Sequence, residues 1–132
     1  MEDKIPASFL DLFEKKSFGH LATLMPDGSP QVSPLWVGYD GKHLILNSEK
    51  GRQKDRNMRR DARVAVEVQD PDNAYRYLLV RGIIVEITEE GAEQGIDDFS
   101  MRYNGTPYKY KNPNSPRVIY KVLPLHVTTS RS

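Results

Sequence analysis

The chain has 132 residues, no cysteine, and 19 basic against 18 acidic side chains, which leave a formal net charge of +1. The length suits one domain over residues 1–132, since a chain of about 130 residues buries roughly two thirds of its unfolded surface in a single core. The near-neutral charge disfavours a dedicated nucleic-acid binder, which normally carries a large positive excess. Without cysteine there is no disulfide, thiol nucleophile or Cys-based metal site.

The sequence contains no run of 18 apolar residues, and its start lacks the basic and apolar stretches of a signal peptide. We therefore expect a cytoplasmic protein with no membrane partner. His20, His43 and His126 are isolated in the sequence and show no metal-ligand spacing, so we expect no metal site.

Apolar spacing and turn residues predict three helices and six strands. In 62–69, Val64, Val66 and Val68 alternate with more polar residues, which is typical of a strand with one buried face. Segment 75–88 is apolar on both faces, so we expect a strand that is covered on both sides, in a small domain by a second subunit. The expected elements are helix 6–16, strands 18–25, 30–39 and 42–48, helix 51–61, strands 62–69 and 75–88, helix 89–103 capped by Thr88, loop 104–116, and strand 117–129 with an interruption at Pro124.

Hairpin connections dominate this order of elements. The chain has no strand–helix–strand alternation and no glycine-rich nucleotide-binding motif, which disfavours Rossmann and P-loop folds. The pattern predicts an α+β fold, a six-stranded antiparallel split β-barrel of the Greek-key type with short flanking helices.

The charge is unevenly distributed, because residues 49–63 carry a net charge of +4 and the remainder carries −3. Arg52 and Lys54 lie at the start of the predicted helix 51–61, where positive side chains oppose the helix dipole. A bound phosphate would compensate that repulsion. Asn47 and Ser48, at the end of the preceding strand, add hydrogen-bonding groups at the same rim.

A solvated helix with pairs such as Asp55 and Arg59 at i,i+4 explains the same stretch without a ligand. This segment by itself leaves both interpretations open.

Pro34 lies inside the predicted strand 30–39. Proline cannot donate a ladder hydrogen bond, so we expect a sheet edge or a bulge where the backbone is free to touch a ligand. Gln31 and Ser33 share one face of this strand and Trp36 projects from the other. Alternatively, Pro34 only blunts an exposed edge and Trp36 belongs to the core.

Tyrosines and an arginine recur on one face of the long strand and around the predicted loop. The side chains on the strand could line the site of a planar ligand, or they could pack at a subunit interface, where Tyr and Arg are enriched. Those around the loop could line a cleft. The residues are Tyr75, Tyr77 and Arg81 on the strand, and Tyr103, Tyr108 and Tyr110 around the loop.

Four segments together carry a family resemblance: LATLMPDGSPQVSPLW, LILNSEKGRQKDRNMRRDARVAVEV, DPDNAYRYLLVRGIIVEI and ID…RY. The chain resembles the pyridoxamine-5′-phosphate-oxidase-like split-barrel flavoproteins, and is most similar to their small coenzyme F-420-dependent oxidoreductases. The resemblance extends over 18–127. Its most specific parts are the basic run at 52–57 and the Tyr-x-Tyr…Arg-Gly run at 75–82.

The resemblance implies a homodimer with two cofactors in the clefts between the subunits. It implies that Arg52 and Lys54, with Asn47 and Ser48, hold the cofactor phosphate, and that Tyr77 and Arg117 come from the partner subunit. The residues bordering the ring system would be Gln31, Ser33, Pro34 and Leu35, and Asn57 closes the basic run as a further cofactor residue.

The expected function is hydride transfer between reduced coenzyme F-420, a deazaflavin, and an electron-poor small-molecule substrate. FMN is the alternative cofactor, since both molecules present a ribityl phosphate. A non-enzymatic flavin or haem carrier is the alternative outside the enzymes. Pyridoxamine-phosphate oxidases carry an Arg-x-His motif near the C-terminus, whereas this chain has LPLHV there, which disfavours pyridoxine phosphate as the substrate.

Overall fold

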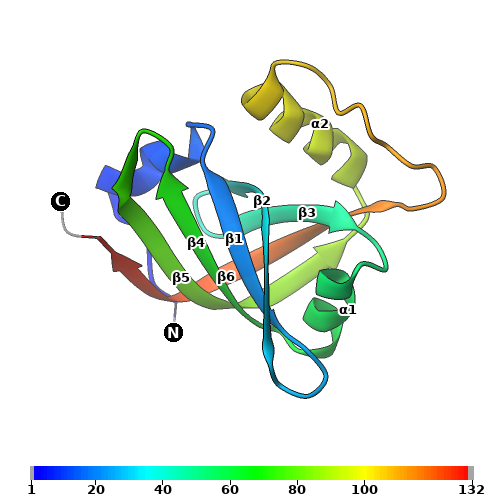
Figure 1. Cartoon of the computed structure of the whole chain (residues 1–132), viewed down its shortest axis with the longest axis horizontal. Helices are drawn as coiled ribbons and strands as arrows, with labels where there is room; N and C mark the ends of the chain where they lie inside the picture. The colour runs from blue at the N-terminus through cyan, green and yellow to red at the C-terminus, as the bar shows by residue number, and fades with distance from the viewer. Residues whose placement is uncertain (1, 131–132) are drawn as a thin grey trace.

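Six antiparallel strands close into one barrel in the order β1-β2-β3-β6-β5-β4 (Figure 1). This computed structural model describes residues 2–130; residues 1, 131 and 132 lie outside the description. The predicted α+β split barrel with short flanking helices is confirmed. The elements are η1 (Ala7–Phe13), β1 (Phe18–Leu24), β2 (Pro30–Tyr39), β3 (Leu44–Glu49), α1 (Gln53–Arg60), β4 (Arg63–Asp70), β5 (Asn73–Thr88), α2 (Ala92–Asn104) and β6 (Arg117–Thr129).

The barrel is open along part of β2. This strand pairs with β1 along 30–36, but it pairs with β3 only through Val37, Gly38 and Tyr39. The first part of β2 therefore has a free edge on the side of β3. Pro34 lies in this part, opposite His20 of β1 and without a register shift, so it marks an edge and not a bulge.

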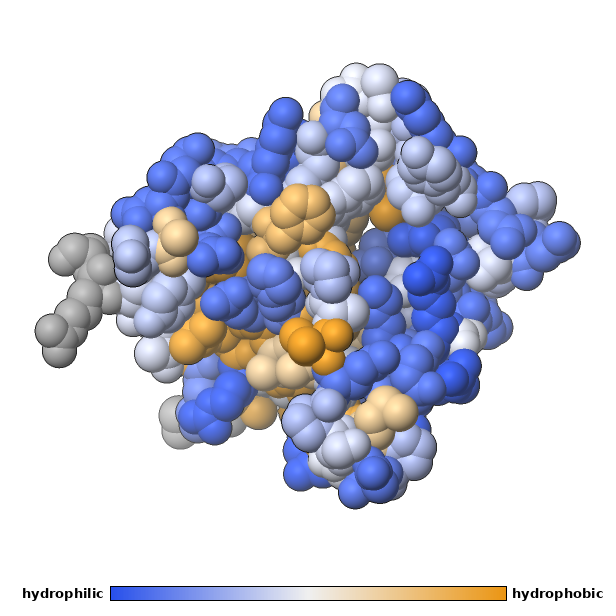
Figure 2. All heavy atoms as spheres, in the orientation of Figure 1, coloured by the Kyte–Doolittle hydropathy of each residue, from blue (hydrophilic) through white to orange (hydrophobic). Residues whose placement is uncertain are grey.

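Alternate side chains of the strands fill the barrel interior. The predicted alternation on β4 is confirmed, because Val64, Val66 and Val68 are buried. Leu12 of η1 and Tyr120 of β6 are fully buried in the same core. Hydrophobic side chains also remain on the outside, and Figure 2 shows them gathered over β1, β2 and β5.

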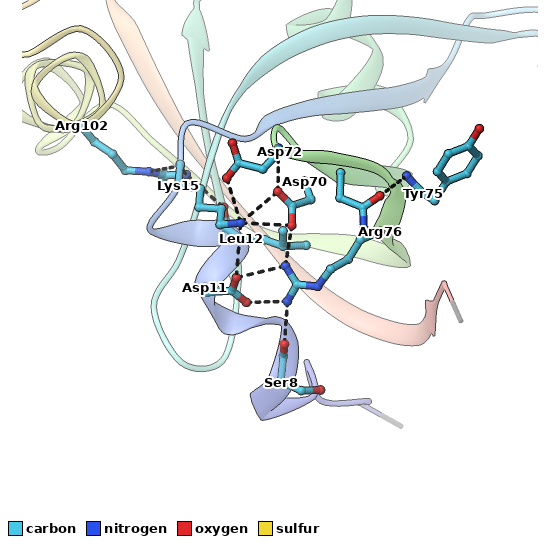
Figure 3. A network of polar contacts seen from close by, with 10 residues as sticks. Ser8, Asp11, Leu12, Lys15, Asp70, Asp72, Tyr75, Arg76 and Arg102 are labelled. Carbon is cyan, nitrogen blue, oxygen red and sulfur yellow. Dashed lines mark hydrogen bonds and ion pairs between the residues drawn. The ribbon is translucent and has the colours of Figure 1, made fainter. Parts of the chain in front are cut away.

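An ion-pair network fastens η1 to the β4–β5 hairpin (Figure 3). The Arg76 guanidinium donates to Asp11 at 2.6 Å and to Asp70 at 2.8 Å. Lys15 donates to the same Asp70 carboxylate at 3.0 Å. Asp70 is buried, so its charge is balanced by two cations from different elements.

Helix α2 packs against β6, β2 and β3. Near its end, Arg102 donates to the Val37 carbonyl at 2.7 Å, and the Tyr103 hydroxyl accepts the Val37 N–H at 3.3 Å and donates to the Ser17 carbonyl. These bonds hold α2 against β2 beside the open edge. None of the helices within residues 2–130 is long and apolar enough to cross a bilayer.

The structure differs from the sequence prediction at three places. The helix expected at 6–16 is a 3₁₀-helix, whose first turn closes when Phe9 N–H donates to the Pro6 carbonyl. Thr88 ends β5 and does not cap α2, which begins after Gly91, where φ is 77°. Strand β6 continues through Pro124, because a register shift against β5 at this point accommodates the missing N–H.

Candidate functional site

A cavity of about 250 Å³ opens between the free edge of β2, the end of β3, the start of α1, α2 and the start of β6. In Figure 2 the surface is hollowed between the hydrophobic face and α2. One end of the cavity is cationic and polar, and the other is aromatic. Its lining residues are Phe18, Pro34, Leu35, Trp36, Asn47, Ser48, Arg52, Lys54, Ile96, Tyr108 and Arg117.

Lys54 is the least compensated charge in this cavity. Its side chain is half-buried, and no carboxylate within residues 2–130 lies at ion-pair distance from it. Burial lowers the pKa of the Lys54 ammonium below its ordinary value, and the positive charges of Arg52 and Arg117 lower it further. Three cations thus converge on one concave surface, which is an arrangement suited to an anion.

The start of α1 adds to this positive potential. Gly51, with φ at 92°, makes a tight entry into α1, and Arg52 occupies the N-cap position without a side-chain cap. The first backbone N–H groups of a helix have no acceptor within it. Their partial charges reinforce the attraction of the three cations for an anion.

The buried side chain of Asp55 stabilises this strand-to-helix junction. Its buried carboxylate accepts the Gly51 N–H at 2.8 Å, the Tyr120 hydroxyl at 2.6 Å and the Arg59 Nε at 3.0 Å. Burial alone would raise the pKa of Asp55, but these three donors outweigh it and hold the pKa below its ordinary value. The Asp55–Arg59 pair expected from the sequence is therefore present, and it also fixes the loop that carries Arg52.

Asn47 lies at the cavity wall, but both ends of its amide are already used. Its Oδ1 accepts from Arg117 Nε at 2.9 Å and its Nδ2 donates to the Ala92 carbonyl at 2.9 Å. Asn47 thereby orients the Arg117 guanidinium, which also stacks 5.2 Å from the Tyr108 ring centre. Arg117 lines the cavity of its own chain, so it reaches this site without a partner subunit.

A second hollow, of about 260 Å³, continues from the first along β2 and shares Arg52 and Lys54 with it. Gln31 and Ser33 line this hollow. The Ser33 hydroxyl is buried and has no hydrogen-bond partner within residues 2–130. A buried hydroxyl normally has a partner, so Ser33 offers an unused donor and acceptor beside the cations.

Asn57 and Tyr77 do not line either hollow. Asn57 is fully buried behind Gln31, where its Nδ2 donates to Thr23 Oγ1 at 3.0 Å and to Gln31 Oε1 at 3.4 Å. It supports the wall of the second hollow. Tyr77 lies on β5, paired with Gln69 of β4.

The aromatic part of the cavity holds Tyr108, which was expected to line a cleft, and two residues that the sequence did not single out as site residues, Phe18 and Trp36. Trp36 is not a core residue; it stacks on Tyr103 with ring centres 5.0 Å apart and meets the edge of Tyr108 at 6.0 Å. Phe18 pairs with Trp36 across the β1–β2 ladder and is 51% exposed. The position of Phe18 could have been predicted from the sequence. If strands 18–25 and 30–39 form a hairpin around residues 26–29, antiparallel pairing places Phe18 opposite Trp36.

The cavity lining contains no Asp, Glu or His, and residues 2–130 hold no group of three such side chains placed for a metal ion. Its cationic side chains suit an anion, and its aromatic side chains present apolar surface. These features define a class: small antiparallel barrels with a cationic, partly aromatic cavity at an open edge. Within this class, the chain belongs to the pyridoxamine 5′-phosphate oxidase family, whose sequence model matches residues 5–131.

Solved structures agree with this family. An F420 reductase is 37% identical, with a TM-score of 0.84, over 94% of this chain and 98% of that chain. A conserved hypothetical protein from Mycobacterium tuberculosis is 26% identical, with a TM-score of 0.76, over 98% of this chain and 86% of that one. An FAD-binding protein from Mesorhizobium loti, at 21% identity and a TM-score of 0.65 over 98% and 96% of the two chains, shares the fold. The family is thus one of flavin- and deazaflavin-type oxidoreductases.

Proposed function

We propose that this protein is an oxidoreductase that transfers a hydride between reduced coenzyme F-420 and an electron-poor small molecule. The observation that carries the proposal is Lys54, a half-buried cation that faces Arg52 and Arg117 and has no carboxylate partner within residues 2–130. Burial and the neighbouring positive charges both disfavour the charged form of Lys54, and a bound anion would offset both effects. The 37% identity to an F420 reductase supports the deazaflavin as the source of that anion.

The residues present fit such a cofactor. Arg52, Lys54 and Arg117 would hold its phosphate, with Ser48 at the same end of the cavity. Along β2, the unpartnered Ser33 hydroxyl and the free edge at Pro34 would face the polar rim of its ring system. When bound, the deazaflavin supplies the hydride chemistry.

The remaining lining residues would position the substrate and keep water out. Phe18, Trp36 and Tyr108 present aromatic surface in the cavity, and Tyr108 lies against the Arg117 guanidinium. Flat, electron-poor molecules stack well on such surfaces. The absence of Asp, Glu and His from the lining fits a protein whose contribution is orientation and electrostatics.

We further propose that the protein is a homodimer whose second copy covers the outer sheet face. Val32 is 68% exposed there and lines a hollow of about 440 Å³ together with Leu79, and a hollow of about 340 Å³ lies over the neighbouring part of the same strands. A hydrophobic surface of this kind is typical of a subunit interface. Tyr77, on this side of β5, would then reach toward the cavity of the partner.

Size-exclusion chromatography with light scattering tests the dimer. We expect twice the mass of the chain for the wild type and a monomer for Val32→Glu. Val85→Glu, which places the same charge on an exposed valine outside both hollows, should remain a dimer. A monomeric wild type would contradict the proposal.

Titration with coenzyme F-420 tests the cofactor site. Arg52→Ala and Lys54→Ala should each weaken binding by about tenfold or more, because a hydrogen bond to a charged group contributes about 1.5–3 kcal/mol. Lys50→Ala is the matched control, since Lys50 belongs to the same basic run but pairs with Glu89 at 3.0 Å. Competition with FMN decides between the two cofactors, and oxidation of reduced F-420 by quinones and nitroaromatics tests for turnover. Unchanged affinity in both cavity variants would overturn the site.

A further inference from the structure

Within residues 2–130, one carboxylate lies at ion-pair distance from the guanidinium groups of the cation cluster, and it belongs to Glu49 at the end of β3. Its Oε1 lies 3.5 Å from Arg52 Nη2 and 3.6 Å from Arg117 Nη1. Its Oε2 accepts from the Ser115 hydroxyl at 3.1 Å. The Glu93 carboxylate meets only the backbone N–H of Arg117, at 3.5 Å. The Glu49 side chain is 18% exposed and that of Arg117 is 8% exposed, so solvent screens this pair incompletely, whereas Arg52 is 60% exposed and its pair is screened more.

Both arginine contacts are long. Charge-assisted N–H···O bonds normally measure about 2.7–2.9 Å, so Glu49 neutralises charge at this site without saturating the donors of Arg52 or Arg117. The three cations and this carboxylate leave a net charge of +2, and donors remain free for another anion. Glu49 is therefore placed where it would compete weakly with another anion for the donors of Arg52 and Arg117.

We infer that Glu49 is an internal counter-ion that competes with the cofactor phosphate for Arg52 and Arg117. This inference rests on the proposed function. A bound phosphate gains the attraction of three cations but is repelled by the carboxylate beside two of them. The affinity of the site for the phosphate is therefore lower, and the phosphate is released faster, than if the three cations acted without Glu49.

The opposite role is that Glu49 orients the two arginines for the ligand. The two roles predict effects of opposite sign when the charge is removed. If Glu49 competes, its neutralisation strengthens phosphate binding. If Glu49 orients, its neutralisation weakens phosphate binding.

Glu49→Gln is the decisive variant, because glutamine keeps the shape and an acceptor for Ser115 while removing the charge. The probes are coenzyme F-420, FMN and riboflavin, which lacks the phosphate. Binding is followed by the fluorescence of Trp36, the only tryptophan of the chain and a cavity residue. Glu89→Gln is the control, since it removes the same charge from an exposed pair with Lys50.

We expect Glu49→Gln to bind F-420 and FMN about tenfold more tightly, with slower dissociation, and riboflavin as the wild type does. Glu89→Gln should change each affinity less than about twofold. Weaker or unchanged FMN binding in Glu49→Gln would overturn the inference, and so would an equal gain in Glu89→Gln. A wild type that binds neither F-420 nor FMN, or binds riboflavin as tightly as FMN, would overturn the proposed function as well.

Discussion

Replacing Asp55 by asparagine tests whether this buried carboxylate fixes the junction that carries the cation cluster. Asp55 accepts hydrogen bonds from Gly51, Tyr120 and Arg59, and its side chain is only 2% exposed. Asparagine has nearly the same shape, so the substitution opens no cavity. The measured effect therefore reports the charge and its hydrogen bonds.

The magnitude follows from the three donors. Breaking a buried ion pair typically destabilises by about 3–5 kcal/mol, but Arg59 is 41% exposed and regains hydration. The amide oxygen of asparagine can still accept from Gly51 or Tyr120. We therefore expect a loss of about 2 kcal/mol in the free energy of unfolding. For a chain of this length, that corresponds to a fall of about 7 °C in Tm.

Urea unfolding followed by circular dichroism measures this loss. Asp61→Asn is the matched control, because it removes the same charge at the end of the same helix, where Asp61 is paired on the surface with Arg63. The control should be affected much less. The reasoning is refuted if Asp55→Asn and Asp61→Asn destabilise the protein equally.

Three further predictions concern the barrel and its attachments. Gly82→Ala should destabilise the protein by more than about 2 kcal/mol in thermal unfolding. A Cβ atom at this position would lie 2.3 Å from the carbonyl oxygen of Leu123, a backbone atom that cannot move away. Wild-type stability in this variant would contradict the prediction. Burial raises the pKa of Asp70, but the Asp72 N–H, Arg76 and Lys15 lower it to about 2. The ionised carboxylate therefore contributes stability, on the order of 1 kcal/mol, above the ordinary pKa of 3.8, and this contribution is lost as the pH falls toward 2. Asp70→Asn should therefore flatten the decline of Tm across that range, and an unchanged acid profile would count against the network. Tyr103→Phe removes the bond to Ser17 and should lower the free energy of unfolding by about 1–2 kcal/mol in urea; no loss would mean that this hydroxyl does not hold α2.

Much of the fold was predictable because its signals are local. The alternation of Val64, Val66 and Val68 indicates a strand, and short turns between strands indicate an antiparallel order. The type of the N-terminal helix was not predictable, because η1 is held by contacts with distant residues, as in the bond from Arg76 to Asp11. The continuity of β6 at Pro124 likewise depends on a register shift in its partner strand.

The cationic end of the site was predictable because Arg52 and Lys54 stand at one strand-to-helix junction. The sequence gives no signal for the contact of Arg117 with Asn47, since the two residues are 70 positions apart and meet only because β3 pairs with β6. Asn57 lies in the same basic run as the cavity residues, but the turn of α1 directs it into the wall. The competing role of Glu49 also emerges only from the distances to its two arginines.

A crystal structure of the protein with coenzyme F-420 tests the central claim most directly. We predict that the cofactor phosphate lies within hydrogen-bond distance of Lys54 Nζ, with Arg52 and Arg117 beside it and the ring system along the free edge of β2. A phosphate bound elsewhere, with Lys54 left without an anion, would contradict the account.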